Sequence, residues 1–277
     1  MSEIILETEH LSFTYPGEST TLSEIGFQVA KGTKVFFHGA NGAGKTTLFQ
    51  CLVGLLKPDS GEIRIHGEAV PKAKERMNRI GIVFQNADDQ IIAGSVFEEI
   101  AFGPINMGLS KEDVLQRVDE TLTMMNLEHL RDKAPHFLSH GEKKRVAIAS
   151  VLSMRRDIVI LDEPTAGLDA FQSEELIAIL NRLTDEGHTL LIATHDSDFS
   201  FRCADHAVVI DQGRLICEGT TEHVFAQSDL LETAKLLKPQ LMTFYEMLSE
   251  WFFIDKGPIP RTLRELSDDL RKARPRQ

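Results

Sequence analysis

The chain has 277 residues with a formal net charge of −12 at pH 7 and 42% hydrophobic residues, the composition of a folded globular protein that buries a core without disulfides. Because binding along a nucleic-acid backbone depends on clustered Lys and Arg, the 42 acidic against 30 basic residues argue against nucleic acid as a partner. The three cysteines form no CxxC motif and no uncharged run approaches the roughly 18–20 residues that span a bilayer, so we expect a protein of a reducing compartment that acts on a membrane, if at all, from its surface.

The first part of the chain alternates short strand patterns with turn signals such as Pro16-Gly17 and Lys31-Gly32. These patterns predict antiparallel strands over Ile4–Glu7, Leu11–Tyr15 and Phe27–Val29. A further strand, Lys34–Phe37, is followed by a glycine-rich loop and by an apolar stretch, Thr46–Leu56, that is long enough for a helix. This order of strand, glycine loop and helix predicts the first half of a βαβ unit.

Apolar runs and helical patterns alternate through the middle of the chain. The expected strands are Glu62–His66, Ile80–Phe84, Ile158–Leu161 and Thr189–Ala193, and a closing hairpin joins His206–Ile210 to Arg214–Cys217. The expected helices are Lys111–Met125, Glu142–Ser153 and Phe171–Leu183. One buried face of the first helix is indicated by Val114, Leu115, Val118, Leu122 and Met125. Short apolar strands between helices predict a parallel sheet that is covered on both faces.

The character of the sequence changes near Ser228, so we expect a main domain over residues 1–227 and a helical appendage over residues 228–277. One helical face of the appendage is apolar and carries Leu241, Phe244, Tyr245, Leu248 and Phe252, with Trp251 beside it. Thr262 and Glu265 have the spacing of a capping box that opens a last short helix. The apolar face either packs on the main domain or forms a second dimer contact or regulatory element, and the sequence favours neither. The basic end, residues 271–276, predicts a solvated tail with weak attraction to an anionic membrane surface.

The first chemical motif is Gly39-Ala40-Asn41-Gly42-Ala43-Gly44-Lys45-Thr46, which matches GxxxxGK[ST] between an expected strand and an expected helix. Glycines allow successive backbone N–H groups to curl around phosphate oxygens, and the helix N-terminus adds a favourable dipole. Lys45 is expected to reach the β- and γ-phosphates, and Thr46 to offer its hydroxyl to Mg²⁺. A merely flexible loop would need the flanking strand and helix by accident. The sequence therefore predicts a nucleotide site formed by Gly39, Asn41, Gly42, Ala43, Gly44, Lys45, Thr46 and Thr47.

A second motif, Ile158-Val159-Ile160-Leu161-Asp162-Glu163-Pro164, places two carboxylates directly after a buried strand. In parallel sheets, ligand sites form at the carboxyl ends of the strands. Asp162 suits a group that holds Mg²⁺ through water, and Glu163 suits a group that polarises an attacking water. Many strands end in an acidic turn with no such role, but a phosphate loop in the same sheet favours the functional interpretation.

The segment Leu138-Ser139-His140-Gly141-Glu142 precedes the expected helix that ends at Ser153. A serine in this place is commonly a helix N-cap, and the same N-terminus is able to bind an anion. The phosphate loop, this serine-glycine segment and Leu161-Asp162-Glu163-Pro164, in that order, resemble the nucleotide-binding subunit of ABC transporters. The usual signature of that family is LSGGQ, from which this chain departs at His140 and Glu142 while it keeps Ser139 and Gly141.

The resemblance implies an α/β fold of the P-loop NTPase type, with a mixed central sheet, an antiparallel β subdomain and a helical signature subdomain over about residues 86–155. It also implies ATP and Mg²⁺ as cofactors and a second ATPase subunit as partner, because in the family two subunits close head to tail around two ATP molecules. Each site would then join the phosphate loop of one subunit to Ser139 and Gly141 of the other, with Asp169 of the D-loop crossing the dimer.

Other residues match further positions of the family pattern. Tyr15 resembles the aromatic residue that stacks on adenine, although its place also suits an ordinary strand aromatic. Gln85 resembles the Q-loop glutamine that senses Mg²⁺ and contacts the transmembrane partner. His195 follows the strand Thr189–Ala193 and resembles the switch histidine at the γ-phosphate, whereas a lone histidine is more often structural. The resemblance thus implies Glu163, His195 and Gln85 as catalytic residues, and Thr46, Gln85 and Asp162 as Mg²⁺ ligands.

Three segments, FQNADDQ from Phe84, FEEIAFG from Phe97 and LSHGEKKRVAI from Leu138, are similar to the ATPases of energy-coupling-factor importers, especially those for cobalt and nickel. In that group the segment after the Q-loop glutamine, here about Ala87–Ile92, meets an integral membrane protein, which implies membrane subunits as partners and a place on the cytoplasmic face of the cell membrane. A solvated acidic turn is the other interpretation of Asp88 and Asp89. The alternative functions are the ATPase of another ABC importer or exporter, for example for a vitamin, and a soluble ABC-type remodelling ATPase, which the acidic balance disfavours.

Overall fold

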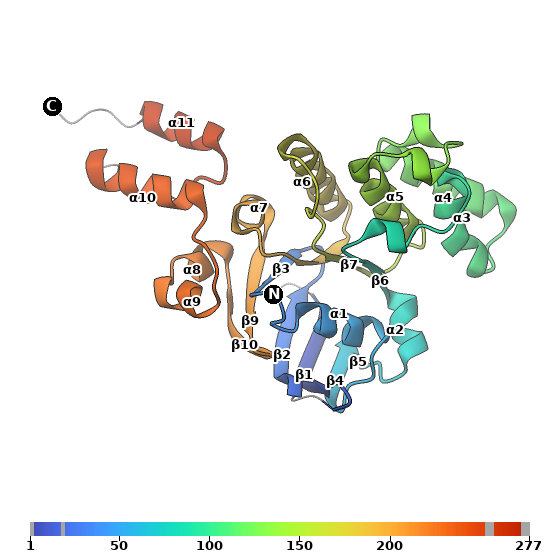
Figure 1. The fold of residues 1–277 in the computed structure, drawn as a ribbon, viewed down its shortest axis with the longest axis horizontal. Coiled ribbons are helices and arrows are strands. Elements are labelled where there is room, and N and C mark those ends of the chain that lie inside the picture. The colour runs from blue at the N-terminus through green and yellow to red at the C-terminus, as the bar shows by residue number, and fades with distance from the viewer. Residues whose placement is uncertain (1–2, 18–19, 253–257, 273–277) are drawn as a thin grey trace.

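The computed structural model describes residues 3–17, 20–252 and 258–272, without the side chains of residues 251, 252 and 272. A six-stranded sheet lies at its centre (Figure 1). Its strands follow the order β10 (Arg214–Gly219), β9 (His206–Asp211), β3 (Lys34–His38), β8 (Thr189–Ala193), β7 (Ile158–Asp162) and β6 (Ile80–Val83). Neighbouring strands are parallel except for β10, which is antiparallel to β9. The predicted mixed central sheet and closing hairpin are confirmed.

Both faces of this sheet are buried, because its inner strands are apolar on both sides. Along β7, Val159 and Leu161 face one core cluster, whereas Ile158 and Ile160 face the other. The first cluster is shared with the helices α3 (Val96–Asn106), α4 (Lys111–Met124), α5 (His140–Leu152) and α6 (Ala170–Asp185). The second is shared with α1 (Lys45–Val53) and with a second sheet. The uninterrupted apolar runs of the sequence therefore correspond to strands that are covered on both faces.

The second sheet is antiparallel and has the strand order β2 (Thr20–Ala30), β1 (Ile4–Thr14), β4 (Ser60–Ile65) and β5 (Glu68–Ala69). The prediction of two strands at residues 4–7 and 11–15 is wrong, because β1 runs through both. His10 adopts a φ of 49° within β1, and the pairing with β2 shifts register between Thr8 and Leu11. This irregularity breaks the sequence pattern as a turn would, but it leaves the strand continuous.

The predicted helices are present with shifted ends. Helix α1 ends at Val53 rather than at Leu56, because Gly54 takes the left-handed conformation and caps it. Leu115 of α4 is 37% exposed, so the buried stripe of that helix is narrower than predicted. The sequence pattern does not predict α2 (Ala73–Arg79), α3, α7 (Ser197–Cys203), α8 (Thr221–Phe225) and α9 (Ser228–Thr233). All but α3 are too short for a clear period, and Gly and Pro near the end of α3 weaken its pattern.

The C-terminal helices α10 (Gln240–Phe252) and α11 (Leu263–Lys272) lie at the opposite end of the molecule from α3, α4 and α5 (Figure 1). Met242 joins a core cluster of the same chain that includes Phe201 and Phe225, and Tyr245 is buried. Phe244, which belongs to the predicted apolar face, is 59% exposed, whereas the adjacent Tyr245 points about 100° away from it and is buried. The side chain of Trp251, that of residue 252 and residues 273–276 of the basic end lie outside the described residues.

The start of α11 is tied to the rest of the chain. The Thr262 hydroxyl accepts from the Glu265 backbone N–H at 3.1 Å, but the Glu265 carboxylate accepts from the N–H of Arg261 (2.8 Å) rather than from that of Thr262. The predicted capping box is therefore displaced by one residue. The Arg261 guanidinium donates to Glu222 and to the Ala204 carbonyl oxygen, each at 2.6 Å. None of the helices described is both long enough and apolar enough to cross a bilayer.

Candidate nucleotide site

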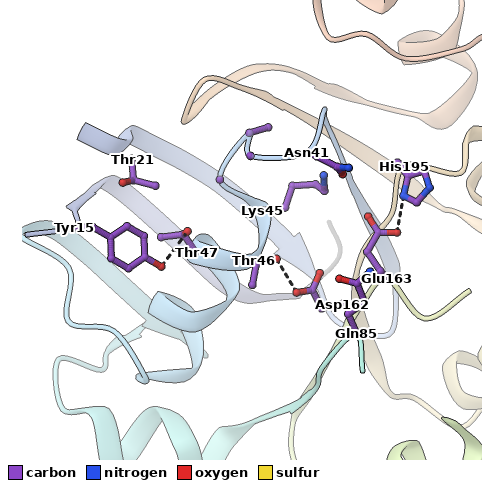
Figure 2. A pocket seen from close by; sticks show the side chains of 13 residues that line it. Tyr15, Thr21, Asn41, Lys45, Thr46, Thr47, Gln85, Asp162, Glu163 and His195 are labelled. Carbon is purple, nitrogen blue, oxygen red and sulfur yellow. Dashed lines mark hydrogen bonds and ion pairs between the residues drawn. The ribbon is translucent and has the colours of Figure 1, made fainter. Parts of the chain in front are cut away.

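A pocket of about 480 Å³ opens at the carboxyl ends of β3, β6, β7 and β8 (Figure 2). Its lining unites residues from separate sequence motifs, namely Tyr15, Asn41, Gly42, Ala43, Gly44, Lys45, Thr46, Thr47, Gln85, Asp162, Glu163 and His195. Thr21 of β2 lines it as well, although no motif predicts this. Parallel strands place the segments that follow them at one edge of the sheet, which is why residues far apart in the sequence meet here.

Two glycines of the phosphate loop stand where a side chain does not fit. At Gly39, φ is 150° and an added Cβ would lie 2.2 Å from the carbonyl oxygen of Ile210 on β9. At Gly44, φ is 108° and an added Cβ would lie 2.9 Å from the Leu22 side chain. The loop packs its backbone directly on neighbouring strands, so its shape depends on glycine at both positions.

Lys45 lies between the two ends of the pocket (Figure 2). Its Nζ donates to the carbonyl oxygens of Gly39 at 2.7 Å and Ala40 at 3.2 Å, and no described carboxylate lies within ion-pair distance of it. Burial lowers the pKa of Lys45, whereas the charges of Glu163 and Asp162 raise it. A buried ammonium group held only by carbonyl oxygens favours an anionic ligand, and a phosphate would supply the counter-charge.

Asp162 and Thr46 present oxygen atoms that fit a magnesium ion. The Thr46 hydroxyl donates to Asp162 Oδ2 at 2.7 Å, whereas the buried Oδ1 has no hydrogen-bond partner in the described part of the chain. Burial raises the pKa of the Asp162 carboxyl, and the hydrogen bond from Thr46 opposes this shift. An unsatisfied buried oxygen is costly, and Mg²⁺ binds carboxylates and other oxygen ligands while it keeps several waters. The residues present at this site therefore fit Mg²⁺.

Glu163 and His195 lie at the end of the pocket away from Tyr15 (Figure 2). Glu163 Oε2 is 2.9 Å from His195 Nδ1, and the two side chains are 9% and 65% exposed. Glu163 has a φ of 46°, which a residue with a side chain adopts rarely, and its backbone N–H donates to the Ala193 carbonyl oxygen at 2.9 Å. Backbone strain of this kind is concentrated at functional sites, which supports a chemical role for Glu163.

Tyr15 closes the opposite end of the pocket. Its hydroxyl lies 3.4 Å from Thr47 Oγ1 and 3.5 Å from Gln50 Oε1, distances that are long for hydrogen bonds. The ring meets Phe13 edge to face, with ring centroids 4.9 Å apart. A half-buried aromatic ring beside a phosphate loop suits contact with a planar base.

The segment that carries Gln85 is held from two sides. Gln85 follows β6 and lines the pocket next to Asp162 (Figure 2). Its carbonyl oxygen accepts from the Nζ of Lys144 on α5 at 2.5 Å. The side chain of Gln90 accepts from the Phe84 backbone N–H at 3.1 Å, which fixes the residue before Gln85. The position of Gln85 is thus defined by residues of both the sheet and the helical layer.

The rest of this segment is tied to α3 and α5 as well. Asp88 is exposed and pairs with Lys143 of α5 at 2.5 Å. Glu99 of α3 is buried, and its carboxylate accepts from two backbone N–H groups at 2.9 Å each, those of Ile92 and Ala93. A buried carboxylate with two such donors makes this connection rigid.

Ser139, Gly141 and Asp169 do not line the pocket. They lie at the N-termini of α5 and α6, where Ser139 forms a capping box with Glu142, and Asp169 forms one with Gln172. An added Cβ at Gly141 would lie 2.7 Å from the Gln172 side chain, so the two helix starts are in contact. Ser139 and Asp169 are exposed and therefore lie on a second surface, separate from the phosphate loop of the same chain, whereas Gly141 is buried.

Residues 22–166 match the sequence profile of the ABC transporter family. The chain belongs to the ABC transporter ATP-binding proteins. It is 48% identical to a putative ABC transporter ATP-binding protein of Methanosarcina acetivorans over 250 aligned residues. The alignment covers 89% of this chain and 77% of that protein. It is 44% identical to the energy-coupling factor transporter ATP-binding protein EcfA of Methanoculleus marisnigri, over 96% of this chain and 90% of that one.

A solved structure agrees with this assignment. CbiO1 of Clostridium perfringens, described as part of the ABC transporter complex CbiONQ, matches with a TM-score of 0.78 and 37% identity over 90% of this chain and all of that one. The P-loop ATPase fold predicted from the sequence is thereby confirmed. ABC transporter ATP-binding proteins are ATPases, so this chain is an ATP-hydrolysing enzyme.

An apolar groove of about 530 Å³ lies between the sheet and the helical layer of this ABC ATPase. Its rim includes Leu55, Ile92 and Phe102, which are 50%, 69% and 50% exposed. Gln90 and Glu99, which hold the Gln85 segment, line the same groove. Exposed apolar side chains gathered in one groove beside a functional segment are typical of a surface that another protein covers.

Sequence reasoning missed three residues of this ABC ATPase. Thr21 lies in a strand and has no local signal. Lys144 does have a local signal in the sequence, because it has helical spacing from the apolar residues Ala147, Ile148 and Val151, which are buried. A charged residue on such a buried helix face indicates a buried polar contact. Glu99 lies on a helix that was itself not predicted, so its buried position could not be read from a pattern.

Proposed function

We propose that this ABC ATPase is the ATP-hydrolysing subunit of an energy-coupling-factor importer and that it energises the uptake of cobalt or nickel ions. The observation that carries the proposal is the single pocket in which the phosphate loop, Asp162, Glu163 and His195 converge. The similarity to EcfA and CbiO1 supports the type of importer. The resemblance of the Gln85 segment and of the signature segment to cobalt and nickel ATPases supports the substrate.

In this proposal ATP lies along the pocket with its base at Tyr15 and its γ-phosphate near His195. The phosphate loop from Gly39 to Thr47 binds the phosphates through backbone N–H groups and the start of α1. Lys45 would exchange its two carbonyl contacts for phosphate oxygens, which supply the counter-charge that its buried ammonium lacks.

Mg²⁺ would be held by Thr46, Asp162 and Gln85. The unsatisfied Asp162 Oδ1 and the Thr46 hydroxyl support this assignment, and the Gln85 side chain lines the same part of the pocket. When bound, Mg²⁺ supplies positive charge that neutralises the phosphate oxygens.

Glu163 would orient the attacking water. Its carboxylate is nearly buried and is held at 2.9 Å from His195, which would face the γ-phosphate with its exposed edge. Phosphoryl transfer needs positioning and charge stabilisation more than covalent chemistry from the protein. The pair Glu163 and His195 would provide the positioning, and Lys45 would provide the charge stabilisation.

A second ATPase subunit, identical or related, would complete each site. Ser139, Gly141 and Asp169 lie outside the pocket of their own chain at two helix N-termini, where Ser139 and Asp169 are exposed and Gly141 is buried. This arrangement supports a head-to-tail dimer in which these residues meet the ATP held by the other subunit. ATP would then stabilise the closed dimer, and hydrolysis would allow it to open.

The membrane partner would bind the apolar groove and the Ala87–Ile92 segment. The exposed residues of the groove need a covering surface, and the segment leads directly to Gln85. In this proposal the contact would hold the ATPase at the cytoplasmic face of the cell membrane. Movement of the partner and occupation of the nucleotide site would thus be linked through one short stretch of chain.

The test is purification of the complex and measurement of uptake. The chain, tagged and expressed in its native cell, is extracted in detergent, and the co-purifying proteins are identified by mass spectrometry. Hydrophobic membrane subunits, together with ATP-dependent uptake of radioactive Co²⁺ or Ni²⁺ into vesicles that contain them, would support the proposal. Uptake of a vitamin instead would reject the substrate, and co-purifying RNA without a membrane protein would reject transport.

A further inference from the structure

Lys144 is a buried cation near the start of α5. It is 1% exposed on α5, and its Nζ donates to the Gln85 carbonyl oxygen at 2.5 Å. Among the described residues, no carboxylate lies within ion-pair distance of it. Burying an unpaired ammonium group is costly, so the contact must be supported by the surrounding structure.

The surroundings of Lys144 connect it to the nucleotide site. Burial lowers the pKa of Lys144, while the charges of Asp162 and Glu163 raise it, which places its ammonium within electrostatic reach of both acids. The adjacent residue, Lys143, pairs instead with Asp88, whose side chain is 53% exposed. Of these two lysines, Lys144 therefore makes the buried contact with Gln85, and Lys143 does not.

The start of α5 joins two different sites. The exposed Ser139 caps the helix on the surface that the proposed dimer presents to the ATP of the other subunit, and Gly141 is buried in the first turn. Lys144 lies three residues after Gly141, within one turn, and contacts the residue that lines this chain's own pocket. A rigid first turn therefore links the surface at Ser139 to Gln85.

We infer that Lys144 is a positioning residue, which holds Gln85 in place for Mg²⁺ by its hydrogen bond to the Gln85 carbonyl oxygen. The inference rests on the proposed function of Gln85. Lys144 itself contacts neither nucleotide nor metal. Its effect is exerted through the backbone of Gln85.

The experiment compares Lys144→Met with Lys111→Met in the purified full-length chain. Methionine keeps the length and apolar stem of lysine but removes the donor, and Lys111, an exposed lysine on α4 away from the pocket lining, provides the control for the same substitution. ATPase rates are measured against Mg²⁺ concentration, and binding of a fluorescent ATP analogue is measured in EDTA. We expect Lys144→Met to raise the half-saturating Mg²⁺ concentration at least fivefold, with analogue binding within twofold of the unmodified chain and Lys111→Met unchanged.

Gln85→Ala and the double variant with Lys144→Met separate positioning from general destabilisation. If Lys144 acts through Gln85, the double variant needs no more Mg²⁺ than Gln85→Ala alone, whereas independent effects multiply. Multiplied effects, or an unchanged Mg²⁺ requirement in Lys144→Met alone, would overturn the inference. If Gln85→Ala itself leaves the Mg²⁺ requirement unchanged, the proposed role of Gln85 is wrong, and the inference falls with it. If Lys144→Met does not fold, Lys144→Leu, which also lacks a side-chain donor, takes its place in the same comparison with Gln85→Ala.

Discussion

Glu163 and His195 are hydrogen bonded at 2.9 Å although they follow two different strands, β7 and β8. The register of these parallel strands pairs Asp162 with Ala193, so the residues that follow emerge side by side at the sheet edge. The backbone hydrogen bond from Glu163 to Ala193 holds the strained residue in place. The carboxylate is nearly buried and the imidazole is largely exposed, which suits the proposed roles of Glu163 as a base and of His195 as its partner at the phosphate.

Replacing Glu163 by Gln should abolish most turnover and preserve nucleotide binding. The amide keeps the size of the side chain but no longer accepts a proton from water, and a general base contributes about a hundredfold or more. ATPase rate and ATP affinity are measured on the same preparation. Glu218→Gln, an exposed change on β10, is the control and should leave both unaltered. Hydrolysis at the normal rate in Glu163→Gln would remove Glu163 from the mechanism.

Replacing His195 by Ala should lower the ATPase rate at least tenfold, but it should add little in a chain that already carries Glu163→Gln. Residues that act as a unit show effects that do not multiply. Single-turnover rates of the two single variants and of the double variant measure this coupling. Fully multiplicative effects would show that the 2.9 Å contact does not matter for the reaction.

Replacing Asp162 by Asn should remove the response to Mg²⁺. In the Glu163→Gln background, which prevents hydrolysis, Mg²⁺ added to ATP should raise the melting temperature, because a ligand that binds the folded chain stabilises it by mass action. With Asp162→Asn also present, ATP in EDTA and ATP with Mg²⁺ should give the same melting temperature. The exposed Asp185→Asn is the control and should keep the Mg²⁺ response.

Replacing Gly39 by Ala should destabilise the chain by about 3 kcal/mol or more, because the new Cβ would meet the Ile210 carbonyl oxygen at 2.2 Å. Gly32→Ala separates this clash from backbone strain. Gly32 also has a positive φ, of 70°, but an added Cβ would meet nothing within 4 Å. The Gly32→Ala change should lower the free energy of unfolding by only about 1 kcal/mol. Urea unfolding of both variants makes the comparison, and equal losses would contradict the predicted clash.

His38 should make the stability of the chain depend on pH below about 6.5. Burial, with a smaller contribution from the Lys45 charge, lowers the pKa of His38 to about 3. Between that value and the pKa of about 6.5 in the unfolded chain, the unfolded state binds more protons, so the free energy of unfolding falls as the pH is lowered. From pH 7 to pH 5 this loss is about 2 kcal/mol. His38→Gln should show a pH 7 to pH 5 loss smaller by that amount, and equal slopes would contradict the prediction.

Much of the site could be read from the sequence, because its chemistry lies in short motifs. The spacing of Gly39, Gly44, Lys45 and Thr46 encodes a loop between a strand and a helix, and the apolar run before Asp162 encodes a buried strand with an acidic end. These patterns act between neighbours in the chain, where periodicity and backbone preferences are sufficient. The sequence near His10 predicts a break between two strands, but the structure has a bulge in one continuous strand. A bulge and a turn interrupt the sequence pattern in the same way, so the pattern alone does not distinguish them.

Only the tertiary structure decided which distant residues meet. The antiparallel sheet brings Thr21 and Tyr15 to the phosphate loop, and the packing of α5 on the sheet buries Lys144 beside Gln85. Phe244 is exposed although it is apolar, because burial depends on which surface faces each side of a helix. The sequence by itself determined the chemistry and the order of the elements, since both are set by local rules. The contacts that position the chemistry arise from side chains far apart in the chain, and their energies exist only once the layers have packed.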